Sequence, residues 1–190
     1  MPKPLVAIDP GHGGADPGAV AGGMRESDLN LQLALKFKAE AESYGFSAVL
    51  LREDDTFLSL ADRAYRANQL KPACVLSFHC NAALSPAAQG YEVFTSPGET
   101  PADSLATYIY ENLDSTGPYE GRPDYDDGDP DKEARFYILR KTNAPAVLVE
   151  FGFMTNDRDL RVLRTGAYQD TFVEAVADAV SDWLQERGEQ

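Results

Sequence analysis

The sequence contains few cysteines and no long apolar run. Its two cysteines, Cys74 and Cys80, allow a single pair, so a disulfide framework is not expected, and we interpret both as reduced, mostly buried thiols. No stretch is long and apolar enough to cross a bilayer, and neither repeats nor an interdomain linker interrupt the chain. Its 190 residues suit one domain of ordinary size. We therefore predict a single domain over residues 1–190 with no membrane span.

Basic residues are also scarce. Lysine and arginine number 17 against 31 aspartates and glutamates, which gives a formal net charge of -14 and a sequence pI of about 4.4. Such a surface repels nucleic-acid phosphates, so nucleic acid is not expected as a partner. The same charge opposes adhesion to anionic membranes or wall polymers, so recognition of a target has to come from a specific site.

The first residues, MPKPLVAIDPGHGG, lack the pattern of a signal peptide, because a very short apolar run follows Lys3 and is itself followed by Asp9 and Gly11. We therefore expect a protein that is made in the cytoplasm without a signal peptide. The alternative is a mature fragment of a secreted protein, against which the starting methionine argues mildly.

Short apolar runs alternate with helical patterns along the chain. Strands are expected at residues 5–9, 47–51, 74–78, 90–94, 136–139 and 147–151. A first helix is expected from Ser27, as its N-cap, to Gly45, and further helices at residues 59–70, 102–112 and 167–186. Residues 11–23 and 114–133 are expected to be loops. This alternation predicts an α/β fold with a mainly parallel sheet that has helices on both faces.

Four residues with metal-binding or acid–base side chains lie at the ends of these elements. The only two histidines, His12 and His79, each follow a predicted strand. Glu150 ends the apolar run AVLVE, and Glu26 lies at the start of the first predicted helix. Strand ends and helix starts of this kind meet at the carboxyl edge of a parallel sheet, where ligands bind. We therefore expect the four side chains to converge on one crevice.

Two imidazoles and one carboxylate are typical ligands of catalytic zinc, because three protein ligands leave a position open for water. A second carboxylate is then free to take a proton from that water. Taken singly, a histidine after a strand is usually a surface residue, and a glutamate at a helix start usually complements the helix dipole. Glu150 is the exception, since a carboxylate after a buried strand is costly unless it is paired or bound to metal. Together the four positions favour a metal site.

Three other features carry weaker signals. The glycines around His12 match neither the dinucleotide fingerprint nor a phosphate-binding P-loop. The acidic residues 124–128 resemble a calcium loop only superficially, because the glycine falls one place too early, and we interpret them as a solvated loop that forms a lip of the substrate groove. Cys80 adjoins His79, but neighbours along a strand point to opposite faces, so both are not expected to bind one metal.

Four ordered motifs resemble those of the type 3 family of zinc-dependent N-acetylmuramoyl-L-alanine amidases. These are IDPGHGGADPGA, Glu26 before a helix, SFHCNA and PAVLVEFGFMTN. Between them, LREDDTFLSLADRAYRAN and FYILRKTNAPAVLVE are also similar to the family. The resemblance runs from about Leu5 to the final helix, and it implies a mixed, mainly parallel sheet between helices.

The resemblance implies that His12, Glu26 and His79 hold one zinc ion and that Glu150 is the catalytic carboxylate. The implied reaction is hydrolysis of the amide between N-acetylmuramic acid and L-alanine in peptidoglycan. The chain departs from the family at Cys80, where a small residue is usual, and in the long acidic loop 121–133. These departures leave the substrate preference of the groove open.

Together with the expected absence of an export signal, the resemblance predicts a phage-type lytic enzyme, an endolysin, that acts as a monomer on the cell wall. An intracellular or truncated host amidase is the alternative origin. One alternative is a zinc amidohydrolase or peptidase that acts on another amide. A second is a non-catalytic wall-binding module of the same fold. The complete set of His12, Glu26, His79 and Glu150 argues against the second alternative, because an inactive copy would be free to lose one of them.

Overall fold

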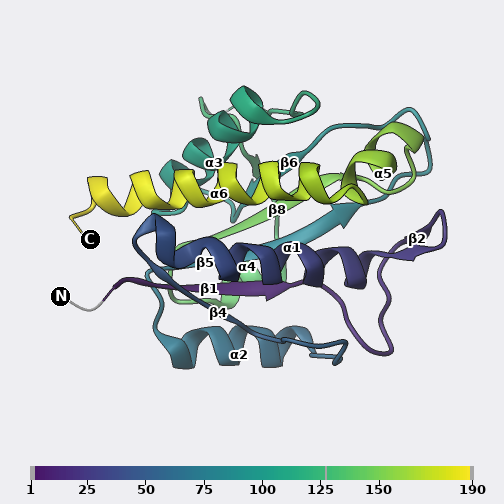
Figure 1. Ribbon diagram of the computed structural model, residues 1–190. Helices are drawn as coiled ribbons and strands as arrows, with labels where there is room; N and C mark the ends of the chain where they lie inside the picture. The colour runs from purple at the N-terminus through teal and green to yellow at the C-terminus, as the bar shows by residue number, and fades with distance from the viewer. Residues whose placement is uncertain (1–2, 127, 189–190) are drawn as a thin grey trace.

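The protein forms a six-stranded sheet with helices on both sides (Figure 1). The computed structural model describes residues 3–126 and 128–188. Along the sheet the strands lie in the order β4 (Ser47–Leu50), β1 (Leu5–Pro10), β5 (Cys74–Asn81), β8 (Ala146–Phe153), β6 (Glu92–Thr95) and β7 (Lys132–Glu133). Neighbours are parallel from β4 to β8, β6 runs antiparallel to β8, and β7 is parallel to β6. The expected mixed, mainly parallel sheet is confirmed.

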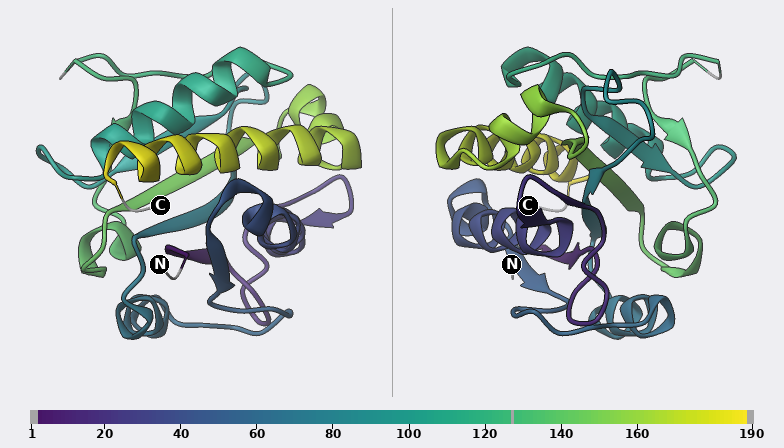
Figure 2. Two further views of the ribbon diagram at one scale, coloured as in Figure 1. Left: turned by 60° about the vertical axis from the view of Figure 1, so that its left-hand side comes forward. Right: turned by 90° about the vertical axis from the view of Figure 1, so that its right-hand side faces the viewer.

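Helices cover the two faces of the sheet unequally (Figure 2). One face carries α1 (Glu26–Glu40), α3 (Asp103–Thr116) and α6 (Gly166–Glu186), with η1 (Ala41–Tyr44) after α1 and α5 (Asp157–Leu163) before α6. Of the helices in the described residues, the other face carries α2 (Leu60–Leu70) and the short α4 (Tyr137–Lys141). We call the first the core face and the second the cleft face.

Alternation along each strand decides which side chains reach each face. In β5, Leu76 and Phe78 join the large apolar cluster of the core face, whereas Val75 joins a smaller cluster on the cleft face. In β8, Val149 and Leu148 divide in the same way. Because both faces are covered, these strands form continuous apolar runs in the sequence.

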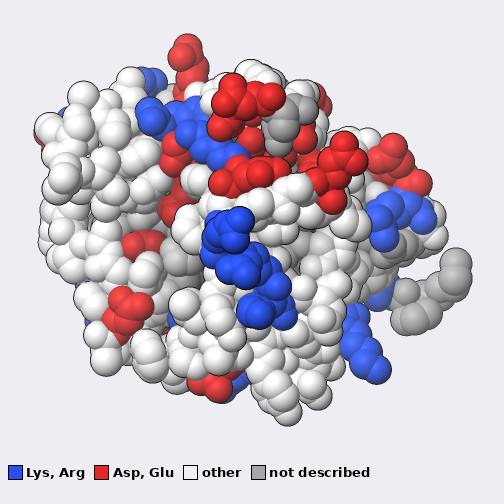
Figure 3. All heavy atoms as spheres, turned by 180° about the vertical axis from the view of Figure 1, so that it is seen from behind, with Lys and Arg blue, Asp and Glu red and all other residues white. Residues whose placement is uncertain are grey.

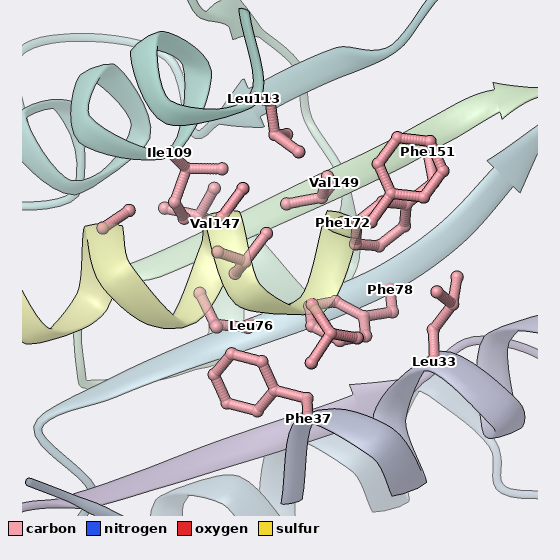
Figure 4. Packing of buried hydrophobic residues seen from close by; sticks show 14 of the residues in the cluster. Leu33, Phe37, Leu76, Phe78, Ile109, Leu113, Val147, Val149, Phe151 and Phe172 are labelled. Carbon is pink, nitrogen blue, oxygen red and sulfur yellow. The ribbon is translucent and has the colours of Figure 1, made fainter. Parts of the chain in front are cut away.

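Aromatic rings form the centre of the core face (Figure 4). Phe78 of β5 lies 5.6 Å from Phe37 of α1 and 5.0 Å from Phe151 of β8, measured between ring centroids. Phe151 in turn lies 5.5 Å from Phe172 of α6. All four rings are fully buried, and each such burial stabilises the fold by about 1.5–3 kcal/mol. The rings therefore fix α1 and α6 against the two central strands.

A short hairpin and a short helix were not expected from the sequence. The hairpin of β2 (Val20–Ala21) and β3 (Met24–Arg25) lies within the glycine-rich loop. The helix α5 follows its N-cap Asn156, whose side chain accepts hydrogen bonds from the amides of Arg158 and Asp159. Both segments are too short to give a clear periodicity.

The first helix begins differently from the expectation. α1 starts at Glu26, and no side chain caps it. The amides of Glu26 and Ser27 instead donate to the carbonyl oxygens of Ala19 and Pro17, at 2.8 and 3.1 Å. The predicted N-cap role of Ser27 was therefore wrong, because the loop before the helix supplies backbone acceptors and Ser27 is buried in the first turn.

The strand expected at residues 136–139 is the helix α4 instead. Ile138 and Leu139 are both buried in the apolar cluster of the cleft face, and the amide of Thr142 donates to the carbonyl of Ile138. An apolar run of this length does not distinguish a short strand from a turn of helix. The prediction was wrong for that reason.

The acidic segment 114–133 is not a loop throughout. α3 continues to Thr116, and β7 occupies the end of the segment. Residues 122–126 are exposed, as expected of a solvated loop. Asp131 is buried, and its Oδ2 accepts a hydrogen bond of 2.7 Å from Thr95 Oγ1. The expectation of a solvated loop therefore fails at Asp131.

No helix within residues 3–126 and 128–188 combines the length and the apolar character that a bilayer crossing requires.

Seen from behind, acidic side chains gather on one part of the surface, and lysine and arginine side chains form a band beside them (Figure 3). Acidic and basic side chains are therefore distributed unevenly on this side of the molecule.

Candidate active site

Polar side chains replace apolar ones on the cleft face where the parallel strands end. Asp9 of β1 lies opposite Ser77 of β5, and His79 of β5 lies opposite Glu150 of β8. Their sequence neighbours in these strands belong to the core-face cluster, so the four polar side chains point the other way. The carboxyl ends of β5 and β8 thus bring two of the four predicted residues, His79 and Glu150, side by side.

The other two predicted residues reach the same place from segments beside the sheet. His12 follows β1, and Glu26 is the first residue of α1. Glu26 Oε1 lies 3.1 Å from His12 Nε2 and 2.9 Å from His79 Nδ1. One ligand atom from each of the three side chains lies within 4.8 Å of the others. The structure therefore brings together the three residues that were expected to hold a metal.

Two glycines allow this close approach. A Cβ atom on Gly11 would lie 2.2 Å from His79 Cε1, and one on Gly18 would lie 2.5 Å from Glu26 Oε2. Separations below 3.0 Å are essentially never seen for real Cβ atoms. The backbone before and after His12 therefore packs directly against the other two candidate ligands.

The pKa values of the three groups are shifted because the carboxylate of Glu26 lies between two imidazoles. Burial alone would raise the pKa of Glu26, but its hydrogen bonds to His12 and His79 hold that pKa far below its ordinary value. Burial alone would lower the pKa of both histidines, but Glu26 reverses the effect and raises the pKa of His12 to about 9 and that of His79 as well. A cation held by these side chains would supply the positive charge that the protons supply here.

The donor set fits a catalytic zinc ion. Two imidazole nitrogens and one carboxylate oxygen are a known ligand set of such sites. His12 Nδ1 lies 2.8 Å from Asp16 Oδ2, which leaves Nε2 directed at Glu26. A bond of this kind from the second ring nitrogen orients a metal-binding histidine. Sequence reasoning missed the role of Asp16, although its spacing of four residues from His12 was visible.

Glu150 lies beside the three candidate ligands and is bonded to none of them. Its Oε2 is buried and has no hydrogen-bond partner among the described residues. Burial raises the pKa of Glu150 to about 7. The negative charge of Glu26 also raises this pKa, whereas the positive charge of His79 lowers it. A carboxyl group in this range can accept and release protons near neutral pH.

A cleft of about 490 Å³ contains all four residues. Its polar lining includes Asp9, Arg63, Ser77 and Asn81 beside the four. Its apolar lining includes Phe57, Leu60, Phe136 and Tyr137, which are 39–59% exposed. The cleft is thus suited to a ligand that has both polar and apolar parts.

The remaining candidate residues lie elsewhere. Cys80 belongs to the core-face cluster and is 1% exposed, which confirms that it points away from the face on which His79 lies. Neither cysteine is part of a disulfide bond, and both are buried, as expected. In the segment 124–128 Asp127 lies outside the described residues, and the described part of that segment does not join the cleft.

Comparison with known proteins identifies similar chains. A family model described as N-acetylmuramoyl-L-alanine amidase matches residues 6–182. The N-acetylmuramoyl-L-alanine amidase LytC of Bacillus subtilis (strain 168) is 33% identical over 182 residues, which are 95% of this chain and 35% of that protein. The endolysin of Bacillus phage SPP1 is 33% identical over 188 residues, which are 95% of this chain and 66% of the endolysin.

Solved structures agree with the sequence comparisons. The crystal structure of N-acetylmuramoyl-L-alanine amidase from Clostridium difficile 630 matches with a TM-score of 0.91 and 32% identity, over 99% of this chain and 100% of that chain. This chain therefore spans the whole of that solved chain but only about a third of LytC.

Proposed function

The chain belongs to the N-acetylmuramoyl-L-alanine amidase family, and from this premise we propose that it hydrolyses the amide between N-acetylmuramic acid and L-alanine in bacterial peptidoglycan. The proposal includes one zinc ion held by His12, Glu26 and His79, with Glu150 as the catalytic carboxylate. The observation that carries it is the meeting of these two imidazoles and two carboxylates in one cleft. All four residues come from the one α/β domain, which we propose as the catalytic unit.

In this mechanism the chain holds the metal and moves one proton. When bound, zinc supplies positive charge that polarises a carbonyl group and makes water more acidic. Glu150 Oε2 takes a proton from the attacking water, because that oxygen is free of other partners among the described residues. The same oxygen then gives the proton to the nitrogen of L-alanine as the amide bond breaks. Water thus supplies the hydroxyl of the new carboxyl group and a hydrogen of the new amine.

The mixed lining of the cleft supports a substrate with both polar and apolar parts. The lactyl and alanyl methyl groups next to the scissile amide suit the apolar lining residues, of which Phe57 is 52% and Leu60 is 59% exposed. Apolar side chains that remain exposed as a group often contact a ligand. The amide itself would lie toward the four polar site residues.

Mass spectrometry of purified peptidoglycan digested by the protein tests the proposal. We expect free stem peptides with a new L-alanine amine, uncut glycan strands, no release after chelation, and recovery when zinc is added back. Cleavage within the stem peptide would replace the substrate assignment by that of a zinc peptidase. Binding to sedimented peptidoglycan without any release, in the presence of zinc, would overturn catalysis in favour of a wall-binding module.

We also propose that the protein acts as a phage-type lytic enzyme on the cell wall. The similarity to the endolysin of Bacillus phage SPP1 supports this role. Expression in a bacterial host together with a pore-forming holin should give lysis, and the Glu150→Gln variant should give none. Normal growth of the host with both active proteins present would contradict the lytic role and leave the amidase proposal intact.

A further inference from the structure

Two buried arginines lie beneath the loop that carries His12. Arg52 follows β4 and Arg63 belongs to α2, and each is only 3% exposed. Buried charges are costly unless hydrogen bonds satisfy them. The hydrogen-bond acceptors of these two guanidinium groups therefore indicate what holds the arginines in the interior.

Within the described part of the chain, the hydrogen bonds of Arg52 all go to backbone carbonyl groups. Its Nε donates to Pro10 O at 2.9 Å, its Nη2 donates to Gly11 O at 2.8 Å and to Ser27 O at 2.9 Å, and its Nη1 donates to Asp54 O at 2.8 Å. Pro10 and Gly11 lie directly before His12, and Ser27 directly follows Glu26. Arg52 therefore ties together the two segments that carry these two candidate ligands.

Arg63 connects the same loop to the third segment. Its Nη2 donates to the carbonyl oxygen of His12 at 2.6 Å, and its Nη1 donates to Asp9 Oδ1 at 2.6 Å. The other oxygen of Asp9 accepts a hydrogen bond of 3.0 Å from Ser77 Oγ. Ser77 lies two residues before His79 on the same face of β5. The two arginines thus link all three ligand-bearing segments.

The backbone of His12 needs such support. Its φ of 60° lies in the left-handed region, which residues other than glycine rarely adopt. A sparsely populated conformation persists only where its surroundings determine it. Here Arg52 holds the carbonyl before His12, and Arg63 holds the carbonyl of His12 itself.

We infer that Arg52 and Arg63 are positioning residues, which hold His12, Glu26 and His79 in the arrangement that binds the metal before the metal arrives. This inference rests on the proposed function, because it takes these three residues as the zinc ligands. Outer groups that orient metal ligands typically change metal affinity by about 10- to 100-fold when they are lost. Arginine suits this positioning role because its planar guanidinium has several N–H donors in a fixed geometry and can bond to several carbonyl oxygens at once. The single ammonium group of lysine does not reproduce that geometry.

The test compares Arg52→Lys and Arg63→Lys with Arg66→Lys. Arg66 lies on α2 as well and donates to the backbone carbonyl of Leu51, which is not part of the three ligand-bearing segments. Zinc affinity of each metal-free protein is measured by competition with a coloured chelator, and unfolding of the metal-free protein is followed in parallel. We expect the first two variants to lose about 10- to 100-fold in zinc affinity while they remain folded, and Arg66→Lys to bind as the wild type does.

Folded Arg52→Lys and Arg63→Lys proteins with unchanged zinc affinity would overturn the inference, since a purely structural role would lower only the unfolding midpoint. If neither lysine variant folds, Ser77→Ala decides, because it removes one hydrogen bond to Asp9 and leaves both arginines in place. A several-fold loss of zinc affinity in that variant supports the inference, and no loss overturns it. A wild-type chain that binds no zinc would overturn the metal site and this inference together. A wild type that binds zinc but releases no stem peptide would overturn only the proposed reaction.

Discussion

The two faces of the sheet use the same strands for different purposes. On the core face β1, β5 and β8 present only apolar side chains to α1, α3 and α6. On the cleft face the same strands begin with small or apolar residues and end with Asp9, Ser77, His79 and Glu150. Successive residues point to opposite faces, so each polar residue of the cleft has a core residue beside it in the sequence.

We therefore expect the core face to determine the stability of the fold and the cleft face to determine the proposed reaction. Removing an apolar group from the core face should weaken the fold and spare the cleft. Replacing Glu150 on the cleft face should do the reverse, because the buried Oε2 of this carboxylate has no hydrogen-bond partner among the described residues and so does not stabilise the fold.

The largest effect is expected from Glu150→Gln. The variant keeps the shape of the side chain but cannot move a proton, so the rate of peptide release should fall by about 10²- to 10⁴-fold. Its zinc content should stay at the wild-type value, and its unfolding midpoint should not fall. The exposed Glu99→Gln serves as the control and should change neither quantity. A Glu150→Gln protein with wild-type turnover would remove the proposed role of this residue.

On the core face, Phe172→Ala should have the opposite profile. The ring is fully buried against Phe151 and Tyr119, so its loss should lower the free energy of unfolding by about 3–5 kcal/mol. Zinc affinity of the folded fraction should change little. Chemical denaturation gives the first quantity and chelator competition the second. A large loss of zinc affinity in the folded protein would show that the two faces are coupled more strongly than the packing suggests.

Gly11→Ala introduces a steric clash with His79 on the cleft face. The added methyl group would meet the ring of His79 at 2.2 Å, so the ring must move and zinc affinity should fall by about 10- to 100-fold. Gly166→Ala is the matched control, because nothing lies within 4 Å of the added carbon there. Isothermal titration of zinc into both variants checks the prediction. Equal affinities would mean that the His79 ring has more room than the structure gives it.

A pH-dependent effect on stability is expected from Asp131, a carboxylate that is buried outside the cleft. Burial raises the pKa of Asp131 to about 8, and the nearby Asp129 acts in the same direction. The folded state therefore prefers the protonated form, so stability is greatest below the ordinary pKa near 4 and is lost as pH rises toward 8, by at most about 1.4 kcal/mol per pH unit. Asp131→Asn should remove most of this dependence and be more stable than the wild type at pH 8.

Denaturation curves of both proteins between pH 5 and about pH 9 test this prediction. Asp126→Asn, which changes an exposed residue of the same loop, should follow the wild type. Parallel pH profiles for the wild type and Asp131→Asn would contradict a buried, protonated Asp131.

The contrast between the faces also explains what the sequence could predict. His12, His79 and Glu150 could be expected to lie close together because they follow or end apolar strands, and the parallel arrangement brings strand ends together. The strand at residues 136–139 was wrong because four apolar residues fit a turn of helix as well. The cap at Ser27 was wrong because backbone carbonyls from a preceding loop took its place.

Hydrogen bonds between residues far apart in the sequence could not be predicted from local patterns. Arg52 and Arg63 lie about 40 and 50 residues after the loop whose carbonyls they hold, and nothing in their local sequence indicates that they are buried. The burial of Asp131 was missed for the same reason, since its partner Thr95 lies 36 residues before it. Local periodicity predicts which face a residue occupies, whereas contacts between distant segments need the fold.

The most direct test of the central claim is to measure zinc content and peptide release on the same samples of wild type, Glu150→Gln and His79→Ala. We expect one zinc ion per chain and release of stem peptides in the wild type, one zinc ion without release in Glu150→Gln, and neither in His79→Ala. Full zinc content in His79→Ala, or loss of zinc in Glu150→Gln, would contradict the division between metal ligands and proton carrier on the cleft face.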